Sequence, residues 1–226
     1  MHNREYSSDA FNQQKLLIRN EENLTIFDVG ACIGEISLKY RSLFPESELY
    51  AFEPYYDSFI ILEQRLISLR KVHMYNFAFS NVNGKSQFNC NKFPPTNSLL
   101  ESSLKADHYW GEELLDTIKL TNVETKTIDD FCYQKSINKI DILKLDTQGS
   151  EYMILEGARS MLKNNLISMI YMEVILVETY KNQKLLSEIT DFLDQFNYRI
   201  FNIYNPRISE NRELNQVDII FLPKGA

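Results

Sequence analysis

Short apolar runs and amphipathic segments alternate along most of the chain. The expected strands cover residues 24–29, 48–52, 72–79, 140–145 and 166–172, and the expected helices cover residues 35–43, 57–69, 127–133, 151–162 and 185–196. Two further apolar runs, at residues 198–204 and 217–222, predict an antiparallel hairpin that closes one edge of the sheet. This alternation predicts an α/β fold, with a mostly parallel sheet covered by helices on both faces.

Three segments stand apart from the alternation. Residues 1–23 are polar apart from one small apolar group, which predicts an N-terminal arm or short helix ahead of a single domain at residues 24–226. Residues 85–90 follow a turn signal and are expected to pair with the strand at residues 72–79. Residues 91–126 are polar and carry several aromatic side chains, which predicts an insertion or lid on the substrate side.

Composition narrows the class of protein. The 226 residues are 44% apolar and carry a net charge of −7, which argues against sequence-independent binding to nucleic-acid phosphates. Cys32, Cys90 and Cys132 lie far apart and form no Cys-x-x-Cys pair, as is usual for reduced thiols. The N-terminus is polar, and the apolar stretch at residues 167–177 is too short to span a bilayer. We therefore expect a cytoplasmic protein without membrane insertion.

The residues that follow the expected strands are the candidate site, because ligands of open parallel sheets bind beyond the carboxyl ends of the strands. These segments are residues 28–34, Glu53 with Pro54, residues 76–80, residues 146–149 and Glu173. Four of the five contain an acidic residue. Acids gathered at one sheet edge are costly unless they bind something.

The first of these loops predicts a cofactor that is not a simple phosphate. Gly30 and Gly34 permit a tight turn and a close approach of the backbone to a ligand. The loop lacks the third glycine of a dinucleotide-binding motif and the Gly-Lys-Ser/Thr of a P-loop. Because Asp28 and Glu35 make it acidic, it suits a ligand with an amino group and a sulfonium. Glu53 lies 19 residues beyond Gly34, where a carboxylate can accept both ribose hydroxyls of a nucleoside.

Five sequence motifs together resemble one family. They read IFDVGACIG, YAFEP, FAFSNVNG, KTIDDF and IDILKLDTQGSEYMILEGA, within residues 24–173. In these motifs the chain resembles the S-adenosylmethionine-dependent methyltransferases of the FkbM family. The resemblance implies a Rossmann-like class I methyltransferase fold with a seven-stranded sheet.

The resemblance also implies a cofactor site. Asp28, Gly30, Ala31 and Gly34 would surround the methionine part of S-adenosylmethionine, Glu53 and Pro54 would lie at the ribose, and the backbone of Ala78 and Phe79 would pass the adenine. One departure stands out after the strand at residues 140–145. The family usually reads Asp-Val-Glu-Gly-x-Glu there, whereas this chain has Gln148 in place of the middle acid.

Methyl transfer to a hydroxyl needs a group that removes the proton of the acceptor. Asp146, Glu151 and Glu173 are the candidate catalytic residues, and His108 is an outside choice. A divalent metal is the alternative way to activate a hydroxyl. Asp141 and Asp146 cannot share an ion, since five strand steps separate them by about 16 Å. Asp146 with Glu151 or Glu173 leaves a metal open, although none is predicted.

The segment at residues 97–110 has the side chains that a sugar-like acceptor requires. Asn97, Ser98, His108 and Trp110 are the candidate substrate-binding residues, because they offer hydrogen bonds and an aromatic face. An aromatic lid would also exclude water from the methyl donor. The expected partner is therefore a small molecule or glycan precursor rather than a nucleic acid.

The leading hypothesis is an O-methyltransferase that acts on a hydroxyl of a sugar, glycan precursor or related biosynthetic intermediate. The alternatives are methylation of RNA or of an amine, a non-catalytic nucleoside-binding domain, and a nicotinamide-dependent oxidoreductase. The net charge counts against the first of these alternatives, the intact Asp28, Gly30, Gly34 and Glu53 against the second, and the missing third glycine against the last. The acceptor molecule, the hydroxyl position and the oligomeric state are not predicted.

Overall fold

The protein is described by a computed structural model that covers residues 6–18, 20–111, 113–209 and 212–225. The strands are β1 Thr25–Val29, β2 Glu48–Phe52, β3 Val72–Tyr75, β4 Ala78–Phe79, β5 Gly84–Asn91, β6 Thr117–Lys126, β7 Ile142–Leu145, β8 Ile170–Ile175, β9 Tyr198–Ile208 and β10 Leu214–Pro223. The helices are α1 Ala10–Leu17, α2 Glu35–Leu43, α3 Tyr56–Leu66, α4 Ala106–Trp110, α5 Ile128–Lys135, α6 Glu151–Glu156, α7 Arg159–Lys163 and α8 Leu186–Asp194, with a 3₁₀ turn, η1, at Pro94–Thr96.

The main sheet has seven strands in the order β3-β2-β1-β7-β8-β10-β9. The five strands from β3 to β8 are parallel, and β10 runs antiparallel to both β8 and β9. This confirms the predicted sheet, including its antiparallel edge hairpin. The order reverses between β1 and β7, so their carboxyl ends form the point where ligands of such sheets bind.

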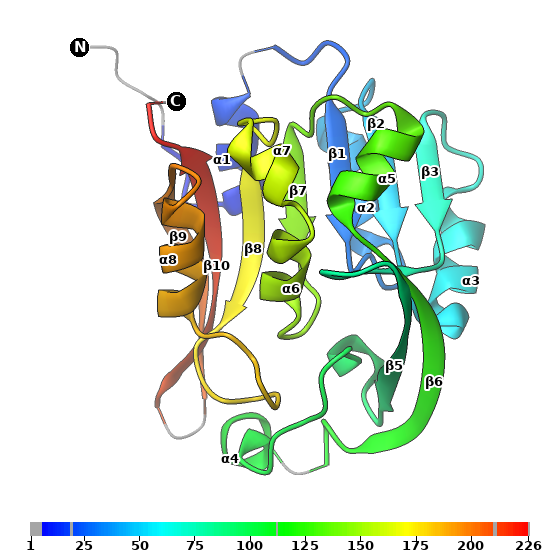
Figure 1. Cartoon of the computed structure of the whole chain (residues 1–226), viewed down its shortest axis with the longest axis vertical. Helices are drawn as coiled ribbons and strands as arrows, with labels where there is room; N and C mark the ends of the chain where they lie inside the picture. Colours follow the sequence, from blue (N-terminus) through cyan, green and yellow to red (C-terminus); the bar gives the residue numbers. More distant parts are fainter. Residues whose placement is uncertain (1–5, 19, 112, 210–211, 226) are drawn as a thin grey trace.

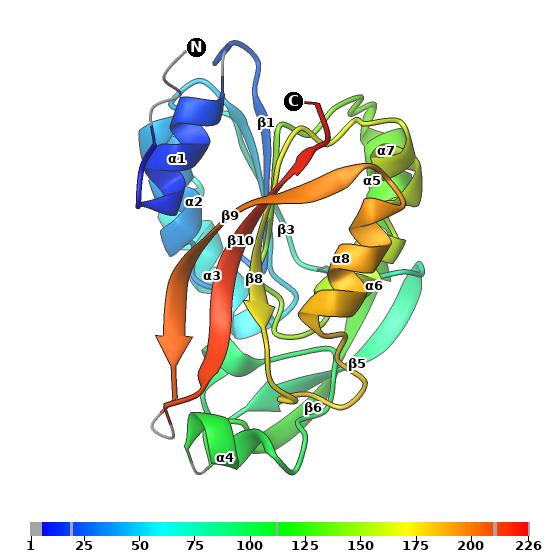
Figure 2. The same ribbon diagram turned by 90° about the vertical axis from the view of Figure 1, so that its left-hand side faces the viewer.

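Helices cover both faces of this sheet, as Figures 1 and 2 show: α5 to α8 lie on one face and α1 to α3 on the other. Helix α1 lies within the expected N-terminal arm. Its cap is Asp9, which accepts a hydrogen bond from the backbone N–H of Asn12. The ring of Phe11 packs 5.4 Å from Tyr40 and 5.3 Å from Tyr171. Residues 10–17 are therefore a helix packed on the domain.

An aromatic cluster joins α5 to the sheet near the site. The Phe131 ring lies 5.2 Å from Phe52, 5.6 Å from Phe79 and 5.8 Å from Phe27. All four side chains are at most 2% exposed. Burial of a phenylalanine side chain contributes about 1.5–3 kcal/mol, so this cluster fixes the ends of β1 and β2 against the helical layer.

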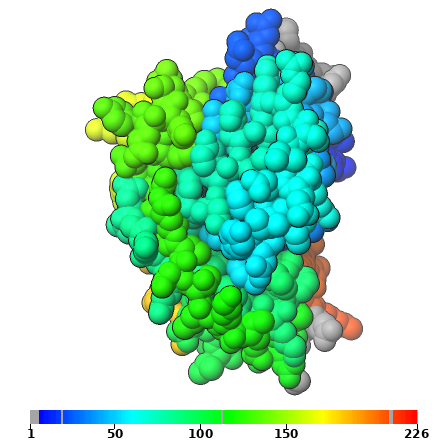
Figure 3. Space-filling model, turned by 90° about the vertical axis from the view of Figure 1, so that its right-hand side faces the viewer, coloured from blue at the N-terminus to red at the C-terminus, as the bar shows by residue number. Residues whose placement is uncertain are grey.

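A smaller three-stranded sheet, in the order β4-β6-β5, lies beyond the carboxyl ends of the parallel strands (Figure 1). The expectation that residues 85–90 pair with residues 72–79 is wrong, because β5 pairs antiparallel with β6 instead. Strand β6 was not predicted. Most of its side chains are exposed, including Ile118 and Leu120, so its sequence lacks the apolar pattern of a buried strand. Figure 3 shows this part of the chain, in green, lying below residues 50–80, in cyan.

Candidate active site

A cavity of about 280 Å³ opens at the carboxyl ends of β1, β2, β7 and β8. Its far side is formed by the segment that joins β5 to β6, which we call the cover segment (residues 92–116). Of the predicted site residues, the cavity is lined by Gly30, Glu53, Pro54, Ala78, Phe79, Asn97, Trp110, Asp146 and Glu173. Residues that are distant in sequence therefore meet here.

The loop after β1 is held against the end of β7. Gly30 has φ +75°, and a Cβ atom on it would lie 1.9 Å from the carbonyl oxygen of Asp146. Only glycine fits that contact. The N–H groups of Gly30 and Ala31 both donate to the carbonyl oxygen of Phe52 at 3.0 Å. Ala31 and Gly34 thus shape the loop, although neither is part of the cavity lining.

Asp28 does not face the cavity, in contrast to its expected place beside the cofactor. Its side chain is fully buried, accepts a hydrogen bond from the Ser37 hydroxyl at 2.6 Å and lies 3.0 Å from the Lys144 ammonium. A carboxylate taken out of water needs such partners, and they draw Asp28 into the sheet. Asp28 therefore supports the loop after β1 through its contacts with Ser37 and Lys144.

Glu53 lies at the end of β2 with its carboxylate on the cavity wall. One oxygen accepts the backbone N–H of Cys32 at 2.9 Å and the other accepts the N–H of Tyr55 at 2.8 Å. Burial raises the pKa of Glu53 to about 7, although these two hydrogen bonds oppose the shift. Each oxygen keeps a further lone pair. The carboxylate can therefore accept two hydroxyl groups that lie side by side.

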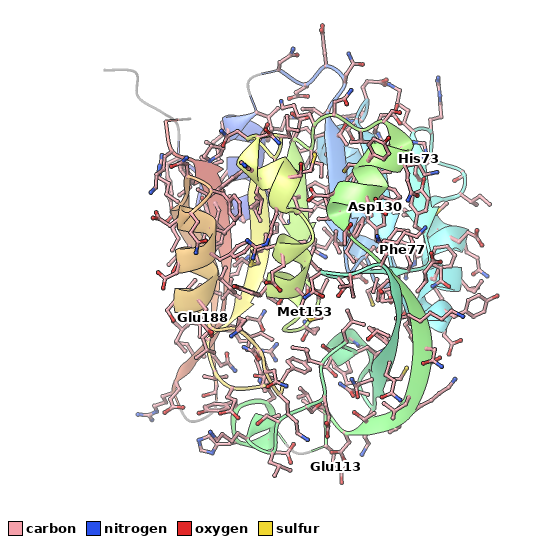
Figure 4. The ribbon with its side chains drawn as sticks, viewed as in Figure 1. His73, Phe77, Glu113, Asp130, Met153 and Glu188 are labelled. Atoms are coloured by element: carbon pink, nitrogen blue, oxygen red, sulfur yellow. The ribbon has the colours of Figure 1, made fainter. Side chains whose placement is uncertain are left out.

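The adjoining wall of the cavity is apolar. It is formed by Phe52, Phe77, Ala78, Phe79 and Phe88. Figure 4 labels Phe77, which lies where the two sheets meet. Asn76 separates β3 from β4, and its amide donates to the carbonyl oxygens of Glu53 and Pro54, at 2.8 and 3.0 Å. A diol-binding carboxylate beside an apolar slot fits a nucleoside, so the residues present fit S-adenosylmethionine.

Two carboxylates, Asp146 and Glu173, lie together on the cavity wall. The side-chain amide of Gln148 joins them, because its nitrogen is 3.1 Å from Asp146 Oδ1 and 2.8 Å from Glu173 Oε1. The second oxygen of Glu173 accepts the amide of Gln216. Burial raises the pKa of Glu173 well above its usual range, and Asp146 and Asp218 raise it further. Glu173 is therefore a stronger base than an ordinary glutamate.

Glu151 is buried away from the cavity, unlike the other two candidate acids. It accepts hydrogen bonds from the backbone N–H and the hydroxyl of Thr147, at 2.7 and 3.0 Å, and from the N–H of Gly149 at 3.3 Å. These bonds close the loop between β7 and α6. Glu151 thus holds the loop that presents Asp146 and Gln148.

Lys144 is a residue of the site that we did not predict. Its side chain is 4% exposed, and its ammonium lies 3.0 Å from Asp28 and 3.6 Å from Asp146 and donates to the Gly30 carbonyl at 3.0 Å. Burial opposes the charge of the ammonium, but Asp28 and Asp146 outweigh it and raise the pKa of Lys144. A lysine inside a wholly apolar strand was the signal, since such a charge requires an acid on a neighbouring strand. Lys144 is in register with Asp28.

The cover segment places two of its four expected substrate residues in the cavity, Asn97 and Trp110. The indole N–H of Trp110 donates to the Thr179 hydroxyl at 2.7 Å, and the Arg207 guanidinium lies 4.9 Å from the centre of its ring. Ser98 is fully buried and donates to the Gln148 carbonyl at 2.7 Å, so it is part of the scaffold. His108 lies on α4 outside the cavity lining.

The opposite wall includes residues from β8 to β10 that sequence analysis missed: Thr179, Tyr180, Arg207 and Gln216. Thr179 and Tyr180 lie in the loop after β8, and the edge hairpin of β9 and β10 brings Arg207 and Gln216 here. Within the described ranges, no three His, Cys, Asp or Glu side chains are arranged to hold a metal ion. No helix among the described residues is long and apolar enough to cross a membrane.

The sheet order, the loop after β1 and the acid at the end of β2 define a class I methyltransferase with a Rossmann-like fold. The FkbM methyltransferase domain matches residues 28–200. The chain belongs to the FkbM family and is an S-adenosylmethionine-dependent methyltransferase.

The chain is similar to several characterised proteins. It is 24% identical over 197 residues to the 2-O-methyltransferase NoeI of Sinorhizobium fredii, a match that covers 84% of this chain and 79% of NoeI. Among solved structures, it matches precorrin-6y C5,15-methyltransferase of Geobacter metallireducens (13% identity, TM-score 0.51, 100% of this chain and 93% of that one). It also matches an rRNA methylase of Streptococcus thermophilus (12% identity, TM-score 0.52, 95% and 93%). At these identities the solved structures show a common fold.

Proposed function

We propose that the protein transfers a methyl group from S-adenosylmethionine to a hydroxyl of a sugar, glycan precursor or related biosynthetic intermediate. The observation that carries this proposal is the pair of carboxylates, Asp146 and Glu173, on the wall of the cavity that also holds Glu53. A hydroxyl acceptor must lose a proton, and this pair can take it. The name of the similar protein NoeI, a 2-O-methyltransferase, supports the same choice of acceptor atom.

The cofactor residues of the proposal lie at the β1 and β2 side of the cavity. Glu53, with Pro54 beside it, would accept the ribose hydroxyls. Ala78 and Phe79 would enclose the base, and Gly30 would let the backbone approach the methionine part. Bound S-adenosylmethionine supplies a methyl group that is activated by its sulfonium. The apolar walls of the cavity exclude water from that group.

Glu173 is the proposed general base, and Asp146 orients the acceptor hydroxyl beside it. Glu173 is the better proton acceptor because burial and its acidic neighbours raise its pKa. Asp146 lies next to the Lys144 ammonium, which offsets its negative charge. Most of the rate gain would come from holding the acceptor oxygen in line with the methyl group.

The proposed acceptor site is the part of the cavity under the cover segment. The Trp110 indole is held by Thr179 and Arg207, so its orientation is fixed for stacking against the apolar face of a sugar. Asn97 lines the same region and offers an amide to the acceptor. In this proposal residues 24–226 are one methyltransferase domain, with residues 91–126 on its substrate side. A small acceptor is favoured over RNA because the chain carries a net charge of −7.

The test is a methyl-transfer assay with labelled S-adenosylmethionine and a panel of acceptors: free sugars, nucleotide sugars, chito-oligosaccharides, small amines and transfer RNA. Label that appears in an ether on a sugar hydroxyl supports the proposal. Transfer to an amine or to RNA, with none to a hydroxyl, would replace it.

Glu53→Ala is expected to weaken binding of S-adenosylmethionine by about 10–100-fold. The ribose hydroxyls lose a charged acceptor, and a hydrogen bond to a charged group is worth about 1.5–3 kcal/mol. Calorimetric titration measures this change. Glu46→Ala is the matched control, because the Glu46 side chain is 81% exposed and forms a surface ion pair with Lys71. Equal affinities for Glu53→Ala and the unsubstituted protein would remove Glu53 from the cofactor site.

The same residue predicts a pH dependence of cofactor affinity. The pKa of Glu53 is raised to about 7, so below pH 7 the carboxyl of the free protein holds a proton that must leave before both oxygens can accept hydroxyls. Affinity for S-adenosylmethionine is therefore expected to rise between pH 6 and pH 8, and Glu53→Gln is expected to flatten this rise. A rise of the same size in Glu53→Gln would assign the pH dependence to another group.

A further inference from the structure

The side chain of Gln148 is placed between three groups of the site. Its amide nitrogen, which has two hydrogens, lies within hydrogen-bond distance of both Asp146 and Glu173. Its amide oxygen lies 3.1 Å from the hydroxyl of Tyr180. Every polar atom of the Gln148 side chain thus has a partner that belongs to the acid pair or to the residue behind it.

Tyr180 is built into this position. Its side chain is fully buried, and its ring packs on Gly149, where a Cβ atom would come within 2.9 Å of the ring. Burial raises the pKa of Tyr180 well above its usual value, so the hydroxyl keeps its hydrogen. That hydrogen is within reach of two acceptors, Gln148 Oε1 and the carbonyl oxygen of Thr96 at 2.9 Å.

The cover segment is therefore connected to Gln148 twice. Tyr180 links its side chain to Thr96, and the Ser98 hydroxyl donates to its backbone carbonyl at 2.7 Å. Gln148 itself has φ +57°, a conformation that non-glycine residues rarely adopt. With this backbone conformation, the Gln148 side chain points toward Asp146 and Glu173.

We propose that Gln148 is a positioning residue for the reaction: its amide holds the Glu173 and Asp146 carboxylates side by side, and Tyr180 fixes the direction in which the amide points. This inference rests on the proposed function. The amide hydrogens contribute to the ionised form of Glu173, because hydrogen bonds to a carboxylate favour its charge. Gln148 thus acts on the proton affinity of the base through its hydrogen bond to Glu173.

The charged and titratable groups that face Glu173 come from four other parts of the fold. They are Lys144 and Asp146 from β7 and the residue after it, Glu151 from α6, Tyr180 from the loop after β8, and Asp218 from β10. Of these groups only Lys144 is positive. Loss of the Gln148 hydrogen bond therefore leaves the Glu173 carboxylate with less stabilisation against the negative charge of its acidic neighbours.

The experiment is a carbon-13 NMR titration of the full chain with labelled glutamate carboxyl carbons, between pH 5 and pH 9. The Glu173 signal is identified by its absence from Glu173→Gln. Gln148→Met keeps the length of the side chain and removes the N–H donors, and it is expected to raise the midpoint of Glu173 by about 1–2 pH units. Gln134→Met is the matched control, because Gln134 is exposed and its side-chain amide donates to Asp130 on the same helix, α5, away from the cavity. A midpoint that stays in place in Gln148→Met overturns the proposal.

Two further variants keep the test decisive. Gln148→Asn suits the positive φ and retains an amide that is one methylene shorter, so it folds even if Gln148→Met does not. It is expected to raise the midpoint in the same direction. Tyr180→Phe removes only the hydroxyl and is expected to raise it less. An unchanged midpoint in Gln148→Asn also counts against the proposal.

The titration needs no acceptor, so it fails or succeeds independently of the proposed function. If no hydroxyl compound is methylated while Gln148→Met still shifts Glu173, the proposed reaction is wrong and the positioning contact stands. If an acceptor is found, the acidic limb of the pH profile of kcat should move upward in Gln148→Met while the Kd for S-adenosylmethionine stays constant. A pH profile that does not move would show that Gln148 has only a structural role.

Discussion

Glu173→Gln lowers the rate of methyl transfer by about 10²–10⁴-fold, the range by which general-base catalysis speeds proton removal. The substitution keeps the size of the side chain and its place on β8, but its amide cannot take a proton. Glu173 lines the cavity, with its two oxygens beside Gln148 and Gln216, and in the proposed function it faces the acceptor. Binding of S-adenosylmethionine is therefore expected to remain within a few-fold of the unsubstituted protein.

The measurement is kcat with the acceptor identified by the screen, together with calorimetric binding of S-adenosylmethionine. Glu188→Gln on α8 is the control, because Glu188 is exposed outside the cavity lining, where it pairs with Lys184 and accepts the backbone N–H of Leu185. Asp146→Asn separates the two acids. If Asp146→Asn abolishes turnover while Glu173→Gln retains it, the roles of base and orienting residue are exchanged. If cofactor affinity of Asp146→Asn falls in step with its rate, Asp146 is a binding residue instead.

Lys144→Met destabilises the folded protein by about 3–5 kcal/mol, the cost of breaking a buried ion pair by removal of one partner. Asp28 is fully buried, and apart from Lys144 its one hydrogen-bond partner within the described residues is the Ser37 hydroxyl. Without the ammonium, the Asp28 carboxylate is left with an uncompensated charge between two strands. Asp146 and the Gly30 carbonyl lose a partner at the same time.

Thermal unfolding followed by circular dichroism measures this loss as a fall in Tm of about 6–20 °C. Lys184→Met is the matched control, because its exposed ion pair with Glu188 is expected to contribute less than about 1 kcal/mol. The double variant Lys144→Met/Asp28→Asn should recover part of the stability. It also removes the buried Asp28 charge, which has no cationic partner in the single variant. Equal Tm values for Lys144→Met and Lys184→Met would show that the pair contributes little.

The main sheet could be predicted from the sequence because its strands are buried on both faces. Runs such as residues 140–145 are apolar almost throughout, and the glycines and acids that follow them mark the carboxyl ends. The cavity residues Gly30, Glu53 and Asp146 directly follow such strands, and Glu173 lies near the end of β8, which is why they could be named. At these strand ends, the residues that the sequence pattern marks are also the residues that line the cavity.

The parts of the fold and of the site that were not predicted depend on contacts between residues that are distant in sequence. Strand β6 is recognised only by its pairing with β5, because most of its side chains face solvent. Asp28 seemed to be a ligand residue until its register partner Lys144 was known. Arg207 and Gln216 reach the cavity from the edge hairpin, and nothing close to them in sequence indicates a site. These features follow from which strands are neighbours.

The contact between Gly30 and the Asp146 carbonyl also bears on how such an enzyme can diversify. The absence of a side chain on Gly30 sets how closely the loop after β1 approaches the Asp146 carbonyl at the end of β7, and the buried Lys144 ammonium bonds the Gly30 carbonyl at the same place. None of these groups belongs to the cover segment, so exchange of side chains in that segment leaves the spacing in place. The cover segment contributes Asn97 and Trp110 from outside the main sheet. If the cover segment binds the acceptor as proposed, substitutions there would change the choice of acceptor and leave the contact between the β1 loop and β7 unaltered.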